Sequence, residues 1–504
     1  MNMSSQDALW LTMDRPNNLM VIDSLMWFES PLALSDVRSV VQERLIDRFA
    51  VYSSRAVDDS GWRWVPHDDF DLDQHVTDVQ LPAPGDMTML QDFVSSQRSL
   101  PLDRDRPLWT LTLIQGFAPA PGVLGSAVLI RSHHSIADGI RLTQVMFSLC
   151  DVDGHPTGVG TSLPAKPSPL GIAASTASEF ASSAADIVTA TARTTGRAAA
   201  APVRGVAAAA TDPSTLLAVP GSVAGGLRDL AGRAAAAARN PARLTDVASL
   251  ISTRGNRPVN DVSSAAKLLL AAPSGQAVWG GQPGVPKSVG WAPELDLDEV
   301  KRIGRATGTT VNDVLLGAIS GTLTRYLREH GDGDLDEVVW MVPVSVRPFD
   351  PDLGDELGNH FSLVAFRMPL GIDDVGERLA EVRRRMDRIK ASDEPLLTYG
   401  VQRVISQAPT PVATGLTNFF ANKAVGVLTN VPGPRGPISF AGQRVAGVLG
   451  WAPCSGDQVM TICIFSYNNR VSIGFAADTA HIPAAGELGA LFATEFDHMS
   501  QAVT

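Results

Sequence analysis

The chain changes character abruptly after Cys150. Residues 1–150 and the stretch from about 285 to the end carry ordinary helix and strand patterns, whereas residues from about 161 to 280 are dominated by Ala, Ser, Thr, Gly and Pro. A chain of 504 residues also exceeds what one hydrophobic core usually serves. We therefore predict two folded domains, residues 1–160 and 285–504, joined by an Ala-rich helical linker over residues 161–284.

The linker also reverses the sign of the charge. From Arg193 to Lys267 it holds ten Lys/Arg against four Asp/Glu, in a chain whose net charge is −12. Val223, Leu227 and Leu230 follow helical spacing within it. A solvated basic connector and an amphipathic segment that contacts anionic lipid both fit this pattern. The negative balance of the whole chain argues against a nucleic-acid binder.

The cysteines and the apolar runs bear on location. Cys150, Cys454 and Cys463 are the three cysteines, and no two of them have metal-binding spacing. This excludes a disulfide scaffold and favours a reducing compartment. The sequence shows no signal-peptide pattern at its start and no run of eighteen apolar residues. We therefore expect a cytoplasmic protein whose membrane contact is peripheral.

Hydrophobic periodicity predicts mixed layers of helix and strand in both halves, that is, an α/β or α+β fold. In the first half, a buried strand is expected at 122–131 and a helix from Ile140 to Leu149. In the second half, helices are expected at 297–307, ending at Gly308, and at 311–330. Strands are expected at 337–345, 360–367, 424–430, 459–466 and 470–476, with Asn468-Asn469 forming a hairpin turn.

The strongest chemical signal is His133-His134-Ser-Ile-Ala-Asp138-Gly139, on a turn from strand to helix. A neutral imidazole with a pKa near 6.5 can take a proton from a hydroxyl while that oxygen attacks an activated carbonyl. We expect Asp138 to fix the turn and Gly139 to permit close backbone approach or an unusual φ.

Other interpretations of this motif stay open on local grounds. A metal site would need ligands beyond His133, His134 and Asp138, and a serine hydrolase would need a G-x-S-x-G elbow that the chain lacks. Two histidines satisfied by backbone groups at a turn would be a purely structural explanation.

The motif is accompanied by seven further segments that together resemble one family, the bacterial wax ester synthase/diacylglycerol acyltransferases. That family belongs to the acyl-CoA-dependent acyltransferases with an HHxxxDG signature. The seven segments are Ser5-Gln-Asp7-Ala8-x-Trp10-Leu11, Arg106-Pro107-Leu108-Trp109, Thr310-Val311-Asn312-Asp313-Val314, Pro343-Val344-Ser345-Val346-Arg347-Pro348, Gly358-Asn359-x-x-Ser362, Thr429-Asn430-Val431-Pro432-Gly433-Pro434 and Ser466-Tyr467-Asn468-x-x-Val471-Ser472-Ile473-Gly474.

The resemblance implies two chloramphenicol-acetyltransferase-like domains with the active site in a tunnel between them and the linker as the crossover. It implies transfer of a fatty acyl group from acyl-CoA to the hydroxyl of diacylglycerol or a long-chain alcohol. Acyl-CoA is then a substrate and no cofactor is needed. Apolar acceptors imply peripheral association with the inner face of the cell membrane or with lipid droplets, and a homodimer stays open.

Residue roles follow from the same resemblance. The catalytic group is His134 as the base, with His133, Asp138, Gly139 and Asn312; the substrate-binding group is Pro107, Leu108, Trp109, Asp313 and Asn430. Asn312 is expected either to donate to an oxyanion or to cap its helix. Asp138 is expected to pair with Arg347, and Asp313 to interact with its helix dipole. Trp109 is expected in the core or in the wall of an acyl channel.

Two alternative functions stay open. One is a related acyltransferase that uses a carrier-bound donor or another acceptor. The other is a catalytically silent protein that binds lipid or coats lipid droplets.

Overall fold

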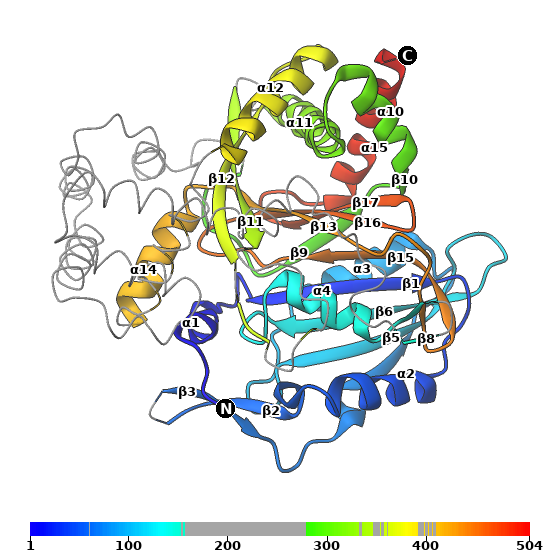
Figure 1. The fold of residues 1–504 in the computed structure, drawn as a ribbon, viewed down its shortest axis with the longest axis vertical. Coiled ribbons are helices and arrows are strands. Elements are labelled where there is room, and N and C mark those ends of the chain that lie inside the picture. Colours follow the sequence, from blue (N-terminus) through cyan, green and yellow to red (C-terminus); the bar gives the residue numbers. More distant parts are fainter. Residues whose placement is uncertain are drawn as a thin grey trace, which may run out of the picture.

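The structure, a computed structural model, describes residues 1–156 and 279–503, except for 60, 153–154, 332–334, 346–352, 354–356, 360 and most of 392–409. The predicted Ala-rich linker with its basic segment lies almost entirely outside the described residues. The described chain forms two large β-sheets, one above the other, with helices around them (Figure 1).

The first half contributes four helices and eight strands to the described fold. Its helices are α1 (Ser5–Met13), α2 (Leu34–Val41), α3 (Met87–Arg98) and α4 (Gly139–Ser148), with a π-helical turn at Gln42–Ile46 and 3-10 turns at Ala50–Ser53 and Leu72–Gln74. Its strands are β1 (Val21–Phe28), β2 (Ser54–Asp58), β3 (Trp62–Pro66), β4 (Val76–Gln80), β5 (Trp109–Phe117), β6 (Gly125–His133), β7 (Asp151–Val152) and β8 (His155–Pro156).

The second half contributes most of the other sheet. Its described helices are α10 (Leu297–Thr307), α11 (Val311–Glu329), α12 (Val375–Lys390), α14 (Thr410–Ala421) and α15 (Ala485–Ala502). Its described strands are β9 (Lys287–Trp291), β10 (Leu295–Asp296), β11 (Glu337–Ser345), β12 (Phe361–Pro369), β13 (Gly426–Pro432), β14 (Ser439–Phe440), β15 (Gln443–Trp451), β16 (Met460–Tyr467) and β17 (Arg470–Asp478). The helices and strands predicted above are confirmed, with ends shifted by a few residues.

Local signals explain where several of these elements end. α10 is capped by Asp296 at its start and stops at Gly308, which has the left-handed φ of 66° that glycine tolerates best. The turn between β16 and β17 places Asn468 and Asn469 at φ 47° and 60°, as a two-residue hairpin requires. Both of these predictions are confirmed.

Two strands of the second half, β14 and β15, join the sheet of the first half. The first sheet has the order β4-β5-β6-β1-β15-β14-β7-β8, and β15 pairs antiparallel with β1, placing Asp23 opposite Trp451. The second sheet has the order β10-β17-β16-β13-β11-β12, with β9 beside β17. A segment of the second predicted domain thus completes the sheet of the first.

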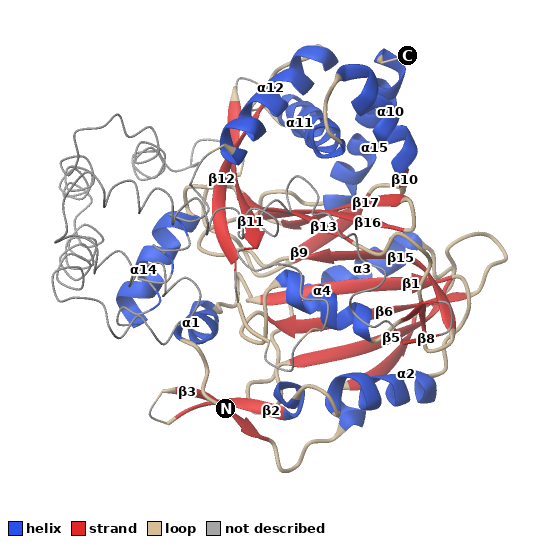
Figure 2. Cartoon of the chain, viewed as in Figure 1, coloured by secondary structure: helices blue, strands red, loops and turns tan. Residues whose placement is uncertain are grey.

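The helices of the second half cover the outside of its sheet. Figure 2 shows α10, α11, α12 and α15 together on the side that faces away from the first sheet. Between the sheets, Trp291 stacks on Trp27 and lies against Trp451, so one apolar core joins the two halves. Among the described residues, no helix has both the length and the apolarity to cross a bilayer.

Candidate active site

The histidine motif lies where strand β6 meets helix α4. β6 ends at His133, and the backbone N–H of His134 donates to the Met20 carbonyl just before β1 (2.7 Å). Asp138 is the N-cap of α4, and its carboxylate accepts from the Arg141 N–H (2.9 Å). Regular structure therefore fixes the motif on both sides.

His133 turns its ring back into the motif. Its Nδ1 accepts a hydrogen bond from the Ser135 backbone N–H (3.1 Å) and lies 2.8 Å from Ser135 Oγ. Burial lowers the pKa of His133 to about 3, helped by the charge of Arg104. The neutral ring therefore carries its proton on Nε2, and its one lone pair is already used. This geometry favours a positioning role over a role as base.

The His134 imidazole is enclosed by aromatic rings from two distant segments. Trp10 of α1 stacks on it with ring centroids 4.2 Å apart, and Phe361 at the start of β12 lies at 5.6 Å. Burial lowers the pKa of His134 to about 4, although contacts with its own backbone and with Asn359 oppose the shift. The ring is therefore neutral at pH 7, which is the form that accepts a proton.

Asn359 from the second half holds the backbone of His134. Its Nδ2 donates to the His134 carbonyl (2.8 Å) and to Asp7 Oδ1 (2.7 Å), and its backbone N–H donates to the same carboxylate oxygen (3.2 Å). Beside it, the Gly358 carbonyl accepts from the Asp138 N–H (3.3 Å). Helix α1, the histidine motif and the segment before β12 therefore meet at one point. Burial raises the pKa of Asp7 despite these hydrogen bonds.

The sequence locates these segments but not their roles. Asp7, Trp10 and Asn359 stand in segments that resemble the family. This resemblance is the sequence signal that could have identified them as site residues. No sequence pattern places α1 and the segment before β12 against His134, because those contacts join residues more than 100 positions apart. Asp7, Trp10, Asn359 and Phe361 are therefore site residues that sequence reasoning misses.

Asn312 and Asn430, both predicted site residues, lie against each other. Asn430 Nδ2 donates to Asn312 Oδ1 (3.1 Å), while Asn312 Nδ2 is buried and has no hydrogen-bond partner among the described residues. Thr310 caps α11 and forms a capping box with Asp313, so the alternative that Asn312 caps the helix is wrong. An unpaired buried amide is rare and calls for an explanation.

Pro107, Leu108 and Trp109 lead into β5 beside the motif. The Leu108 carbonyl accepts from the His133 N–H (2.9 Å). Trp109 is 1% exposed, and its Nε1 donates to the Tyr52 carbonyl (2.7 Å). Trp109 is thus buried, as both a core residue and a wall residue of an acyl channel would be.

Asp138 fixes the turn as expected, whereas Gly139 differs from expectation. Asp138 caps α4, and Arg347, its predicted partner, lies outside the described residues. Gly139 does not have a left-handed φ, and a Cβ at this position would meet no atom within 4 Å. The expectation of an unusual φ or a close approach at Gly139 is therefore wrong.

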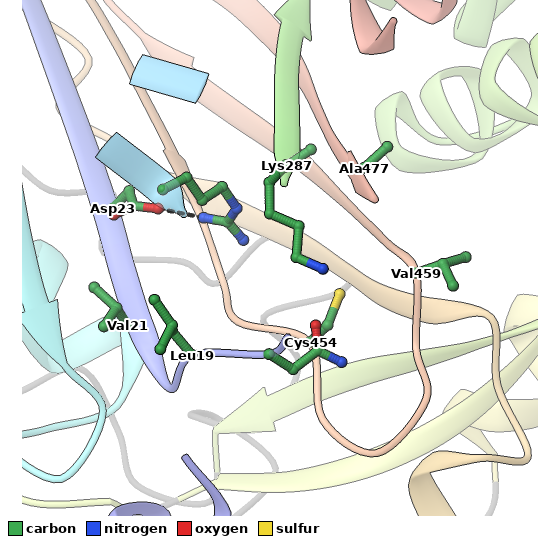
Figure 3. A pocket seen from close by; sticks show the side chains of 10 residues that line it. Leu19, Val21, Asp23, Lys287, Cys454, Val459 and Ala477 are labelled. Carbon is green, nitrogen blue, oxygen red and sulfur yellow. Dashed lines mark hydrogen bonds and ion pairs between the residues drawn. The ribbon is translucent and has the colours of Figure 1, made fainter. Parts of the chain in front are cut away.

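A polar pocket lies between the two halves, next to the start of β1. Its lining includes Val21, Asp23, Lys287 and Cys454 (Figure 3). Lys287 Nζ donates to the buried carboxylate of Asp478 (2.8 Å), so its charge is balanced. Leu19 and Val21, the two neighbours of Met20, both line the pocket, so it lies beside the carbonyl that accepts from the His134 N–H.

Comparison with known proteins shows the family of the chain. Residues 3–266 match the sequence model of the wax ester synthase/diacylglycerol acyltransferase catalytic domain, and residues 357–500 match that of the family's C-terminal domain. A probable diacylglycerol O-acyltransferase of Mycobacterium tuberculosis is 27% identical over 433 residues, 84% of this chain and 78% of that protein. The O-acyltransferase WSD of Acinetobacter baylyi is 22% identical over 487 residues, 95% of this chain and 92% of that protein.

Two solved structures share the fold. The wax ester synthase/diacylglycerol acyltransferase from Marinobacter aquaeolei superimposes with a TM-score of 0.63 at 18% identity, covering 100% of both chains. The first condensation domain of the calcium-dependent antibiotic synthetase gives a TM-score of 0.53 at 14% identity, covering 100% of this chain and 95% of that one. The predicted α/β fold with two acetyltransferase-like halves is confirmed.

The fold and the histidine motif define an acyltransferase of the two-domain HHxxxDG class. Because the catalytic-domain model matches more than half of the chain and includes the motif, the protein belongs to the wax ester synthase/diacylglycerol acyltransferase family. The family predicted from the sequence is confirmed.

Proposed function

We propose that this protein transfers a fatty acyl group from acyl-CoA to the hydroxyl of diacylglycerol, of a long-chain alcohol, or of both. Family membership supports this reaction class, and the relatives named above support the choice of acceptors. The observation that carries the proposal in this chain is the neutral His134 imidazole, enclosed by Trp10 and Phe361 and held through its backbone by Asn359.

In this proposal His134 is the general base. Its imidazole accepts the hydroxyl proton as the acceptor oxygen attacks the thioester carbonyl, which forms a C–O bond and a tetrahedral oxyanion. The C–S bond then breaks, and the proton passes from His134 to the departing thiolate of coenzyme A. The acceptor is itself the nucleophile, so the acyl group never bonds to the protein. A positioned base typically supplies ~10²–10⁴ in rate.

We propose that Asn312 donates a hydrogen bond to the oxyanion of the tetrahedral intermediate. Its Nδ2 is a buried donor without a partner, and Asn430 fixes the opposite end of the amide. An amide N–H donates without titrating, and loss of one oxyanion donor typically lowers kcat by ~10²–10³. Pro107, Leu108, Trp109 and Asp313 stay predicted as substrate-binding residues.

We further propose that the apolar substrates reach the site from a membrane or lipid-droplet surface. Diacylglycerol and long-chain alcohols partition into such phases because burial of each methylene group is favourable by about 0.8 kcal/mol. Deleting residues 215–250, the centre of the basic linker, should weaken co-sedimentation with anionic liposomes. Unchanged co-sedimentation would remove that segment from the proposal. Whether the protein is a homodimer stays a prediction.

The direct test of function is product analysis. Full-length protein is incubated with radiolabelled palmitoyl-CoA and either dioleoylglycerol or hexadecanol, and the lipids are separated by chromatography. We expect labelled triacylglycerol, labelled wax ester, or both, together with free coenzyme A. No product from either acceptor would contradict the proposal and favour a carrier-bound donor, a different acceptor or a silent lipid-binding protein.

The pH profile tests the state of the base. With a pKa of about 4, His134 stays neutral between about pH 5.5 and 8, so we expect kcat/KM to stay constant there. A histidine with an ordinary pKa near 6.5 would lose about tenfold between pH 7.5 and 5.5. A fall in kcat/KM with a midpoint near pH 6.5 in folded protein would contradict a buried neutral base.

Melting temperatures across the same pH range are the control for this profile. The folded-state pKa values of His133 and His134 are about 3 and about 4, below the unfolded value. The unfolded chain therefore binds protons first, and the free energy of unfolding falls as the pH drops below about 6.5. Rates are compared only where the protein is fully folded.

A further inference from the structure

We propose that an apolar cavity beneath helix α4 binds the acyl tail of the acyl-CoA donor and that Met146 sets the chain length it accepts. The inference rests on the proposed function and names the binding site for one part of its substrate. The cavity lies between α4 and one face of the first sheet. Its sheet side is built from three pairs of residues two positions apart: Ile22 and Ser24, Trp109 and Leu111, and Ile130 and Ser132. Alternate residues of a strand share a face, so the three strands form one continuous wall.

The strand register shows which end of the cavity lies nearer to the histidine motif. Ser132 pairs with Ile22 on one side and with Trp109 on the other, in a row next to the histidine motif. Ile130 forms the second row with Ser24 and Leu111, about 7 Å further from the motif.

Helix α4 runs back along this wall. The chain reverses at the motif, so Leu142 lies nearest to it and Leu149 farthest, with Val145 and Met146 between them. These four lining positions span about 10 Å along the helix. The cavity therefore leads away from the motif, as a tail attached to a thioester at His134 would.

The lining suits a hydrocarbon chain. No residue around the cavity carries a charge, and the hydroxyl of Tyr52 is hydrogen-bonded to Ser132. Buried apolar surface that contacts an alkyl chain gains free energy in proportion to the area removed from water. A phosphate or a nucleotide could not be accommodated here without an unpaired buried charge.

The opposite face of β1 favours the donor over a fatty alcohol as the occupant. Val21 and Asp23 alternate with Ile22 and Ser24, so the polar pocket with Lys287 lies on the other side of the same strand. An apolar and a polar recess thus flank the strand end beside His134. Acyl-CoA is amphiphilic, so it matches an apolar recess beside a polar one better than a fatty alcohol does. The match rests on polar groups and not on a free cation, because Lys287 is paired with Asp478 and Arg98 with Asp23.

Side chains that line the cavity must move before a long acyl tail can enter. The cavity measures about 20 Å³, which is room for about one water molecule. Met146 is unbranched, has three rotatable bonds and tolerates different packing arrangements, so it is the lining side chain best able to move. The volume of the Met146 side chain then determines how many methylene groups of the acyl tail are buried.

The test compares a methionine that lines the cavity with a buried methionine that does not. Met146→Ala enlarges the cavity, whereas Met368→Ala removes the same side chain from the fully buried core of the second sheet, away from the cavity. Binding of octanoyl-CoA and dodecanoyl-CoA is measured by calorimetry without acceptor. Each newly buried methylene adds about fourfold in affinity, so Met146→Ala should raise the dodecanoyl preference by about fifteenfold for two methylenes. Met368→Ala should leave the preference unchanged.

A filling variant keeps the proposal testable if Met146→Ala does not fold. Ser24→Leu adds volume in the second row and should shift the preference toward octanoyl-CoA. An unchanged preference in folded Ser24→Leu and Met146→Ala would overturn the proposal. The proposal would also be overturned if the variants changed only the preference for the chain length of the alcohol, measured at fixed palmitoyl-CoA. Because binding is measured without turnover, a failure of the cavity is distinguishable from a failure of the acyltransferase function.

Discussion

Replacing His134 by Asn lowers the rate of acyl transfer by about 10²–10⁴ while the protein still folds. Asparagine keeps a polar side chain against Trp10 but cannot take a proton from the acceptor hydroxyl. The rate is measured as thiol release from palmitoyl-CoA with dioleoylglycerol or hexadecanol. Circular dichroism and the melting temperature report folding.

The neighbouring histidine supplies the matched control. His133→Asn leaves an acceptor near the position of Nδ1, where the Ser135 N–H donates, so the turn keeps its hydrogen bond. We expect this variant to retain most of its activity. Equal losses in His133→Asn and His134→Asn would show that both substitutions merely disturb the turn, and full activity of His134→Asn would contradict its role as base.

Replacing Asn359 by Leu lowers kcat by about 10²-fold, because loss of the bond to the His134 carbonyl lets the imidazole shift and small misplacements are costly. Leucine has a similar volume but donates no hydrogen bond. The Asp7 carboxylate also loses one of its two side-chain donors and keeps Ser4 Oγ, so the free energy of unfolding should fall by about 1–3 kcal/mol. Steady-state kinetics and urea unfolding measure the two effects separately.

A second substitution separates positioning from stability. Asp7→Leu/Asn359→Leu removes the buried carboxylate that has lost its amide partner, although the Asn359 backbone N–H loses its acceptor as well, so part of the lost stability should return. The His134 carbonyl still lacks its donor, so kcat should stay low. Recovery of kcat together with stability would mean that Asn359 supports the fold and does not position His134.

The parts of the structure that the sequence predicts are those encoded locally. The end of α10 at Gly308 and the hairpin at Asn468-Asn469 follow from backbone preferences of single residues. The turn that carries His134 follows from a strand pattern running into a helix pattern. In each case the signal and the structure lie within a few residues of each other.

The parts that the sequence does not predict depend on contacts between distant segments. β15 belongs to the second half of the chain and is not among the strands predicted from the sequence, yet it pairs with β1, because the pairing partner is set by the packing of both halves. The clamp formed by Asp7 and Asn359 around the His134 backbone has the same origin. At Asn312 a local signal leads to a wrong prediction. An Asn near the start of a helix suggests an N-cap, but Thr310 occupies the N-cap position.

A single-turnover experiment tests most directly whether His134 drives direct transfer from acyl-CoA to the acceptor. Excess enzyme is mixed with radiolabelled palmitoyl-CoA and dioleoylglycerol, or hexadecanol, and quenched at increasing times, and label on coenzyme A, lipid and protein is counted. We predict that label passes from coenzyme A to neutral lipid without appearing on the protein, and that it stays on coenzyme A in His134→Asn. Label accumulating on the protein, or transfer at the wild-type rate by His134→Asn, would contradict the mechanism.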